Sequence, residues 1–459
     1  MTRPFITYRR GVIAFLVLVL ALPATTQAGP IGSATAQRIG NMSPADRAIL
    51  IQSARHPAFP AVLVRARKAG VDVSIEKHFQ AVPQIFSNSA VYYLRMAQDD
   101  QFEVDDAEKS ALSLLDIPKP SADQWQAAAT FVNTHKNLMT MAHAAASYKL
   151  FAVPREDNGY QPDSWKFPEL TSCRRVARLL TLESLLWAKS GNYAEAVNNE
   201  QKCFQVGDHA SSDITMVAWL VAISIDHIGL KGMQSILAMS SGNPAVVQIV
   251  DKAVRTCWRP RLMSSLIKSE DAQMIAQVEF WSRLTPEKFL EENGGHTAQL
   301  VPDPHTFAAM MDAMNARLIG DEVSMIEIAD RPYPESSKRL RAIVNRAQNC
   351  KTFDSILAKF VLPVVGKSED LIAQDTATAA ITRAACSVFI YKSKHGDYPS
   401  TLADAAPKAT DPFDGKLLGY RQTANGFVVY SVGPTGKYDG GDFDSKKRHE
   451  EVFRYSSHE

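Results

Sequence analysis

Apolar residues recur at helical spacing along most of this chain, from Met42 to about residue 368. Strand-like alternation of apolar and polar residues is almost absent over that length, so the pattern predicts a domain that is close to all-helical. Local signals agree with this prediction. Ser121 and Gln124 form a capping box that opens a long helix running to Leu150, and Pro154 closes that helix.

The predicted helices are expected to pack as antiparallel pairs. The stretch 185–197 resembles the turn of a tetratricopeptide repeat, because Gly191 and Asn192 give a tight turn and Ala196 is small where the two helices would touch. Residues 215–236 are apolar enough to form another, buried helix pair. No second copy stands at the ~34-residue period of such repeats. A stack of helix pairs and an irregular helical bundle both fit this pattern.

The pattern changes near residue 366. A helix from about Ser368 to Lys392, capped by Gly396, is followed by two predicted strands at 417–422 and 427–432. The Asn425-Gly426 pair between the strands is a strong hairpin signal, because both residues tolerate positive φ. The predicted fold class is therefore mainly α, with stacked antiparallel helix pairs followed by a small α+β module.

The C-terminal module contains five parts in a fixed order, which are the Tyr391-Lys392 helix end, the turn at 396–399, the segment 411–413, the aromatic strand pair and an acidic, glycine-rich loop after Gly436. In this order of parts, residues 371–444 resemble the soluble head of the major pseudopilins of type II secretion. The helical block before it is similar to exported helical proteins with no assigned function. It therefore adds no function to the resemblance.

The resemblance implies a calcium site and a docking role. In the pseudopilin family the acidic loop binds calcium, and the matching residues of this chain are Asp439, Asp442 and Asp444. Calcium takes six to eight oxygen ligands, so carbonyls and water would complete the set. The family's closing tryptophan and its assembling N-terminal helix are missing here. The module is therefore expected to dock or to stabilise rather than to enter a pseudopilus shaft.

The first 28 residues have the features of a secretory leader. Arg9 and Arg10 precede the apolar run 11–22, and Thr26 and Ala28 fit the −3 and −1 positions of a signal-peptidase site. The apolar run is shorter than the ~20 residues of a membrane-spanning helix. We expect cleavage, export to the periplasm or beyond, and no transmembrane span in the mature chain. An uncleaved leader that anchors the protein is the alternative.

The predicted organisation follows from these signals. It comprises a signal peptide at 1–28, a linker at 29–40, a helical domain at 41–366, the pseudopilin-like module at 367–444 and a charged tail at 445–459.

Charge and cysteine content exclude some functions. The chain of 459 residues has 50 Lys and Arg against 49 Asp and Glu, so it lacks the basic surplus of a nucleic-acid-binding protein. Its five cysteines have no spacing typical of zinc. Buried free thiols and one or two disulfides, for instance between Cys173 and Cys203, both fit the pattern.

No motif in the sequence identifies a reaction. Zinc-protease, serine-hydrolase and phosphate-binding signatures are all missing. His135 and His143, eight residues apart on one predicted helix, are expected to be structural, and so is the Asp226-His227 pair, which is expected to be buried and hydrogen-bonded.

We therefore predict a non-catalytic, extracytoplasmic binding or scaffold protein of the cell envelope, whose partners are envelope or secretion-system proteins. The alternative is a secreted hydrolase with a site built in loops from His296, Asp303 and His305.

Overall fold

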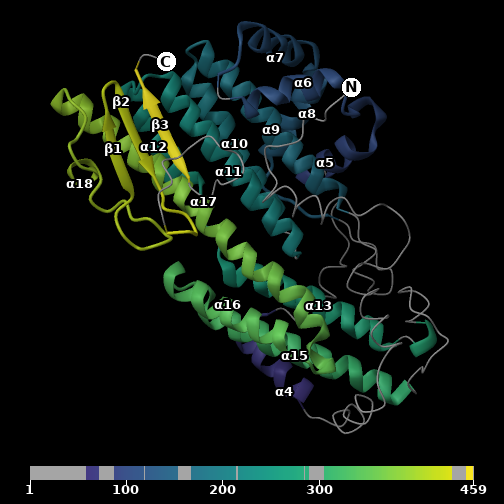
Figure 1. Ribbon diagram of the computed structural model, residues 1–459. Helices are drawn as coiled ribbons and strands as arrows, with labels where there is room; N and C mark the ends of the chain where they lie inside the picture. Colours follow the sequence, from purple (N-terminus) through teal and green to yellow (C-terminus); the bar gives the residue numbers. More distant parts are fainter. Residues whose placement is uncertain are drawn as a thin grey trace, which may run out of the picture.

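The computed structural model describes residues 58–71, 87–117, 119–153, 167–212, 215–283, 285–288, 304–436 and 451–457. These residues form a mostly helical protein of packed helix pairs, with a small antiparallel sheet near the C-terminus (Figure 1). The prediction of a mainly α fold with a small β element is therefore confirmed. The predicted leader and linker lie outside the described residues.

The helices follow one another with short connections. The first half contains α4 (Ala58–Lys68), α5 (Ser89–Gln98), α6 (Asp106–Ser113), α7 (Ala122–Thr134), α8 (Lys136–Ser147), α9 (Pro168–Lys189), α10 (Tyr193–Ser211) and α11 (Met216–Met239). The second half contains α12 (Pro244–Cys257), α13 (Met263–Arg283), α15 (Pro304–Ala329), α16 (Tyr333–Asn349), α17 (Ile356–His395) and α18 (Leu402–Ala405). Short 3-10 turns occur at Asp100–Phe102, Leu114–Asp116 and Phe353–Ser355.

The predicted long helix from residue 125 to Leu150 is wrong in one respect, since it is divided into α7 and α8. The capping box of Ser121 and Gln124 opens α7 as predicted. His135 then leaves the helical conformation, with φ −101° and ψ 44°, and its ring stacks on Phe131. The predicted turn between α9 and α10 is present, and Gly191 adopts a positive φ of 84° in it.

The predicted helix pair at 215–236 is instead the single helix α11. Two glycines, Gly229 and Gly232, lie inside it and let α10 approach closely. A Cβ at Gly229 would lie 2.9 Å from the ring of Phe204, and one at Gly232 would lie 2.2 Å from a carboxylate oxygen of Glu200. These glycines therefore serve close packing rather than a turn.

The predicted boundary at residue 366 lies inside α17, which is continuous over 40 residues. Pro363 lacks the N–H that would bond to the carbonyl of Lys359, and such a loss normally bends or ends a helix. Gln348 of α16 compensates for it, because its Nε2 donates to the Lys359 carbonyl oxygen at 2.7 Å. The helix that opens the C-terminal module is therefore an extension of the helical domain.

The sheet has the order β1-β2-β3, with β1 (Gly419–Thr423), β2 (Gly426–Tyr430) and β3 (Val452–Ser456) antiparallel to their neighbours. The predicted β1–β2 hairpin is present, but its two turn residues are 424 and 425. Gly426 pairs with Thr423 as the first residue of β2, and neither Asn425 nor Gly426 has a positive φ, so the predicted turn is wrong in its position and its conformation. The strand β3 corrects the prediction of a plain charged tail, since the apolar side chains of Phe453 and Tyr455 pack inward there. On that inner face Phe389 of α17 forms edge contacts with Phe427, Phe453 and Tyr455.

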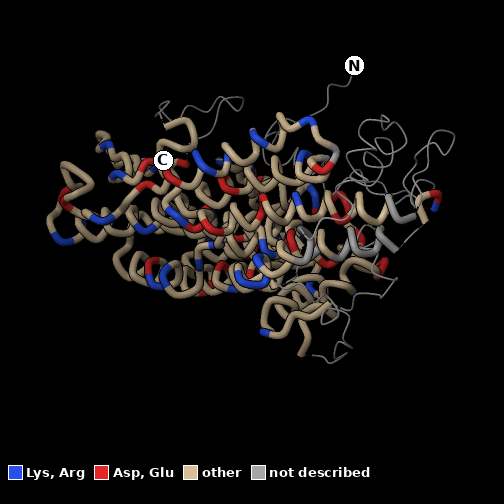
Figure 2. Tube along the Cα trace, turned by 90° about the horizontal axis from the view of Figure 1, so that it is seen from below, with Lys and Arg blue, Asp and Glu red and all other residues tan. Residues whose placement is uncertain are grey.

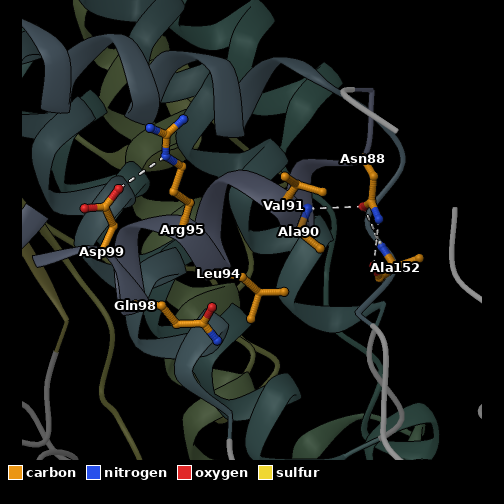
Figure 3. A pocket seen from close by; sticks show the side chains of 8 residues that line it. All are labelled: Asn88, Ala90, Val91, Leu94, Arg95, Gln98, Asp99 and Ala152. Atoms are coloured by element: carbon orange, nitrogen blue, oxygen red, sulfur yellow. Dashed lines mark hydrogen bonds and ion pairs between the residues drawn. The ribbon is translucent and has the colours of Figure 1, made fainter. Parts of the chain in front are cut away.

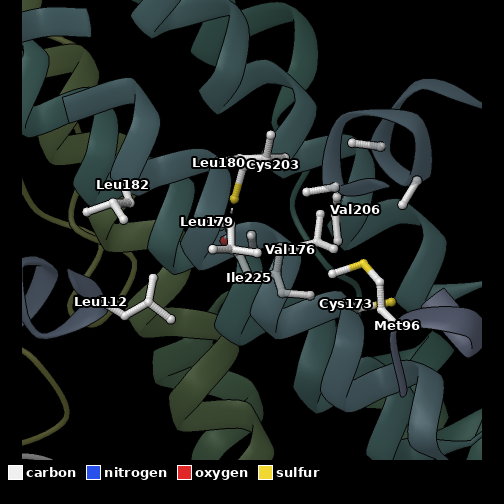
Figure 4. Packing of buried hydrophobic residues seen from close by; sticks show 14 of the residues in the cluster. Met96, Leu112, Cys173, Val176, Leu179, Leu180, Leu182, Cys203, Val206 and Ile225 are labelled. Atoms are coloured by element: carbon white, nitrogen blue, oxygen red, sulfur yellow. Dashed lines mark hydrogen bonds between the residues drawn. The ribbon is translucent and has the colours of Figure 1, made fainter. Parts of the chain in front are cut away.

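The apolar cores join neighbouring elements. One cluster contains residues of α5, α6, α7, α8, α9, α10 and α11, and Figure 4 shows part of it around Leu179, Leu180 and Ile225. A second cluster contains residues of α10, α11 and α12 together with α17 and the sheet. A third joins α11, α13, α15, α16 and the start of α17. The sheet therefore shares its core with the helical domain.

Candidate functional site

An open groove of about 630 Å³ lies along one face of α5 and is shown in Figure 3. It is lined by Asn88, Ala90, Val91, Leu94, Arg95, Gln98, Asp99 and Ala152. The apolar side chains lie in the middle of the groove, while amide and charged groups stand at its ends (Figure 3).

Asn88 fixes the groove in place. Its Oδ1 accepts from the N–H of Ala90, which caps α5, and also from the N–H of Ala152 at 3.0 Å. Its Nδ2 donates to the Ala152 carbonyl at 2.8 Å. One buried side chain therefore starts the helix and holds the segment that forms the opposite wall, as a capping residue with a long-range partner can.

The other end of the groove carries Arg95 and Asp99, whose Nε and Oδ2 atoms lie 3.5 Å apart. Hydrogen bonds from Gln101 lower the pKa of Asp99, so its carboxylate is charged at neutral pH. The eight lining residues include no serine, cysteine or histidine that would act as a nucleophile or base. The chemistry of the groove is therefore suited to holding an apolar segment with a polar end.

A buried histidine supports the groove from inside. The ring of His209 contacts the hydroxyl of Tyr93 at Nδ1 (3.0 Å) and the Tyr148 carbonyl at Nε2 (2.6 Å), and Phe151 stacks on it. Burial lowers the pKa of His209 to about 4. The neutral ring therefore donates from Nε2 to the carbonyl and accepts the Tyr93 proton at Nδ1.

A half-exposed polar group joins α8, α9 and α10. The Nε2 atom of His143 lies 2.8 Å from Glu183, which also accepts from Asn199 at 2.7 Å. The Nδ1 atom of His143 lies 3.1 Å from the Lys202 ammonium. Although burial opposes ionisation, contacts with His143, Asn199 and Lys202 lower the pKa of Glu183. His143 is therefore tied into a polar network, whereas His135 lies at the α7–α8 junction, 3.3 Å from Asp105.

The predicted buried pair Asp226-His227 has a different partner. Asp226 bonds to Arg261, whose Nε and Nη2 atoms approach its two oxygens at 2.6 and 3.1 Å. Burial raises the pKa of Asp226 to about 6 and Arg261 opposes that rise. Arg261 also donates to Ser211 at 2.7 Å. The prediction of a buried Asp226-His227 pair is therefore wrong, because His227 is only partly buried and the partner of Asp226 is Arg261. Asp226 itself is buried and hydrogen-bonded.

Three further carboxyl groups, those of Glu270, Asp271 and Glu322, are buried between α13 and α15. Burial raises the pKa of both Glu270 and Asp271 to about 7. The pKa of Glu322 is also raised well above its ordinary value, first by burial and then by Asp271. Burial therefore favours the protonated form of all three groups, and Glu270 and Asp271 change protonation near neutral pH. Among the residues that the structure describes, no group of three or more His, Cys, Asp or Glu side chains is arranged to hold a metal ion.

The structure describes only one of the residues predicted to bind calcium or to form a loop-built hydrolase site. The calcium candidates Asp439, Asp442 and Asp444 lie outside the described residues, as do His296 and Asp303. His305 lies in the first turn of α15. All five cysteines are free thiols, and Cys173 and Cys203 are buried in the same apolar cluster on α9 and α10.

Sequence reasoning missed the groove and the partners in the two polar networks. Asn88 is a recognisable cap in front of α5, but nothing local shows that it also bonds to Ala152. Arg261 stands in a short connection between helices, where an arginine is normally solvated. Its burial follows only from the packing of α10 and α11.

The described residues form a mainly helical protein with a small C-terminal sheet and an open groove along α5. The helix α11 is long and apolar enough to span a membrane, but 67% of its most apolar window is buried within the protein, as for a core helix. Comparisons of the chain with protein-family models, with curated proteins and with solved structures found no match.

Proposed function

We propose that this chain is exported and acts without catalysis as a binding or scaffolding component of the cell envelope, together with proteins of the secretion machinery. The observation that carries the proposal is the continuity of α17. Its first part packs against α15 and α16, and its last part packs on the sheet of the module whose sequence resembles a pseudopilin head. A docking module that is joined to a helical domain by one continuous helix can hold a bound partner at a fixed position, as a scaffold protein does.

Contacts between the two parts support this reading. The aromatic ring of Phe389 packs against three rings of the sheet, while the other sides of α17 contact α11 and α12. Polar bonds cross the same region: Gln234 donates to Thr382 at 3.0 Å, and Lys231 pairs with Glu451 at 2.9 Å. A partner bound to the sheet would therefore be held at a fixed position relative to the helices.

The α5 groove offers a second binding surface. It is open and of a size that ordinarily holds a small molecule or a few side chains of a peptide. We propose that it takes an apolar segment of an envelope protein whose polar end meets Arg95 and Asp99.

Calcium at Asp439, Asp442 and Asp444 belongs to the same proposal. The described residues before this loop are firmly held, because Asp411 accepts from the Ser431 hydroxyl at 2.9 Å and from the Val432 N–H at 2.8 Å. Calcium would then stabilise the loop that follows, by the linkage of ligand binding to folding.

The test combines location and partner capture. Fractionation and sequencing of the mature N-terminus should find the protein outside the cytoplasm, starting at Gly29. Crosslinking in the envelope fraction should capture a protein that is lost with Leu94→Arg in the groove and kept with the matched surface change Leu262→Arg. A cytosolic location, or equal capture by both variants, would contradict the proposal.

The hydrolase alternative is tested separately. Alanine at His296, Asp303 and His305 should then abolish a hydrolytic activity of the purified protein while leaving partner capture unchanged.

A further inference from the structure

Basic residues are concentrated in α16, in the residues that flank it and in the beginning of α17. Between residues 331 and 368 the chain has eight basic and two acidic residues, whereas the whole chain has a net charge of only +1. We call this region the basic face; its basic residues are Arg331, Lys338, Arg339, Arg341, Arg346, Lys351, Lys359 and Lys367. Figure 2 views the molecule from below, the side on which Figure 1 places α16.

Part of this charge is neutralised within the protein. Arg341 pairs with Asp370 at 3.2 Å, and Arg346 pairs with Asp321 at 2.6 Å. Arg331 and Arg339 share Glu335. Counting Asp321 and Asp370, the basic face still has a surplus of four positive charges.

The lysines differ from the arginines. Lys338, Lys351 and Lys359 form none of the ion pairs found among the described residues, and the first two are exposed. Lys338 lies on α16, Lys359 lies on α17, and Lys351 lies in the connection between them. The two helices are packed side by side, as shown by the bond from Gln348 to the Lys359 carbonyl. The charge that stays available is therefore a set of separate ammonium groups over a two-helix layer.

An aromatic residue accompanies these lysines. Phe360 is 37% exposed and follows Lys359 directly on α17, although a phenylalanine is usually buried. Lysines together with an exposed aromatic side chain are typical of surfaces that lie on an anionic bilayer, where the ring enters the headgroup region and the ammonium groups meet lipid phosphates.

We infer that the basic face binds the surface of an anionic lipid bilayer. An acidic protein is the less suitable partner, because the arginines that would form bidentate pairs with its carboxylates are already engaged internally. Lipid phosphates can pair with separate ammonium groups in any arrangement, so a bilayer surface can bind without a cleft in the protein. This inference deepens the proposed function, since it names a membrane surface on which the envelope scaffold lies.

The experiment uses the purified full-length protein and vesicles of phosphatidylglycerol mixed with phosphatidylcholine, with phosphatidylcholine vesicles as the uncharged comparison. Co-sedimentation should show binding to the anionic vesicles only, and the binding should weaken as salt is added. Changing Lys338, Lys351 and Lys359 together to Gln should weaken it about a hundredfold, since each basic residue near such a surface contributes ~1 kcal/mol.

A matched variant controls for net charge. Lys252, Lys394 and Lys408 are exposed, and Lys394 lies about 50 Å from Lys359 along α17 at 1.5 Å per residue. Changing these three to Gln should leave vesicle binding within about twofold of the unchanged protein. Phe360→Ser should remove the part of the binding that resists salt, and circular dichroism should show that each variant is folded.

Three outcomes would overturn the inference. They are no binding to anionic vesicles, equal losses in the two triple variants, and binding of polyglutamate or of DNA through the basic face without binding to vesicles. None of these outcomes bears on capture of a protein through the α5 groove. The inference and the proposed function therefore fail separately.

Discussion

Replacing Glu200 with glutamine should make the protein more stable at alkaline pH. Glu200 lies on α10 with its side chain fully buried. The Thr181 hydroxyl donates to its Oε2 at 3.1 Å, while its Oε1 has no hydrogen-bond partner and faces Gly232. Burial raises its pKa to about 8, against 4.5 for an ordinary glutamic acid. The folded protein therefore holds a proton there at neutral pH.

The magnitude follows from this shift. Because the folded pKa of Glu200 is higher than the unfolded one, the stability that this group contributes is complete below pH 4.5. The contribution falls as the pH rises toward 8, and above pH 8 it is lost. A pKa unit corresponds to ~1.4 kcal/mol, so the full loss is on the order of 5 kcal/mol. Glutamine has nearly the same shape and no proton to lose. The unpaired amide of glutamine should cost about 1 kcal/mol. The Glu200→Gln variant should therefore be more stable than the unchanged protein by roughly 2–4 kcal/mol above pH 8.

The assay is urea denaturation of both proteins at pH 5 and at pH 8. Other buried acids titrate too, so the decisive quantity is the difference between Glu200→Gln and the unchanged protein at each pH. That difference should be small at pH 5 and large at pH 8. Thr181→Val is the control, because it removes one hydrogen bond and should cost about 1 kcal/mol at both pH values. A glutamine variant that is less stable at pH 8 would show that Glu200 is ionised and that the argument from burial is wrong.

Three further predictions concern other parts of the protein. Arg261→Met should cost about 3–5 kcal/mol in urea denaturation, because it leaves Asp226 buried without a partner, and adding Asp226→Asn should recover part of the loss. Phe389→Ala should cost about 3–5 kcal/mol and speed proteolysis near the sheet, whereas Lys394→Ala should change neither. Millimolar calcium should raise the melting temperature, and the rise should disappear with Asn at Asp439, Asp442 and Asp444.

The features that could be predicted from the sequence are helix caps and turns, which depend on residues close together in the chain. The cap at Ser121, the glycine turn at residue 191 and the helix end at Gly396 depend on residues within one turn, and each is present. The predicted boundary at residue 366 lies close to Pro363, a residue that usually bends or ends a helix. In this protein Gln348 of α16 donates to the Lys359 carbonyl that Pro363 leaves without its usual donor, and α17 continues through the predicted boundary.

Features that depend on residues far apart in the chain could not be predicted from the sequence pattern. The strand β3 pairs with β2 across more than twenty residues of chain, and its five residues alternate too briefly to be separated from a tail. The α5 groove depends on Asn88 meeting Ala152, 64 residues further along the chain. Such pairings are fixed by packing between elements, which a single sequence does not state.

Directional polar bonds fix the position of the C-terminal module on the helical body. Across the contact between α11, α12 and α17, Gln234 donates to Thr382 at 3.0 Å, and Trp258 donates to Asp375 at 3.0 Å. Apolar packing alone would tolerate a shift of α17 by one turn, since the hydrophobic effect has no direction. Such a shift would leave both buried pairs unmade at about 1–3 kcal/mol for each group, a large share of the 5–15 kcal/mol that stabilises a typical domain. The sheet therefore keeps one position relative to the helices. A partner bound to the sheet and a bilayer bound to the basic face would be held at a constant separation.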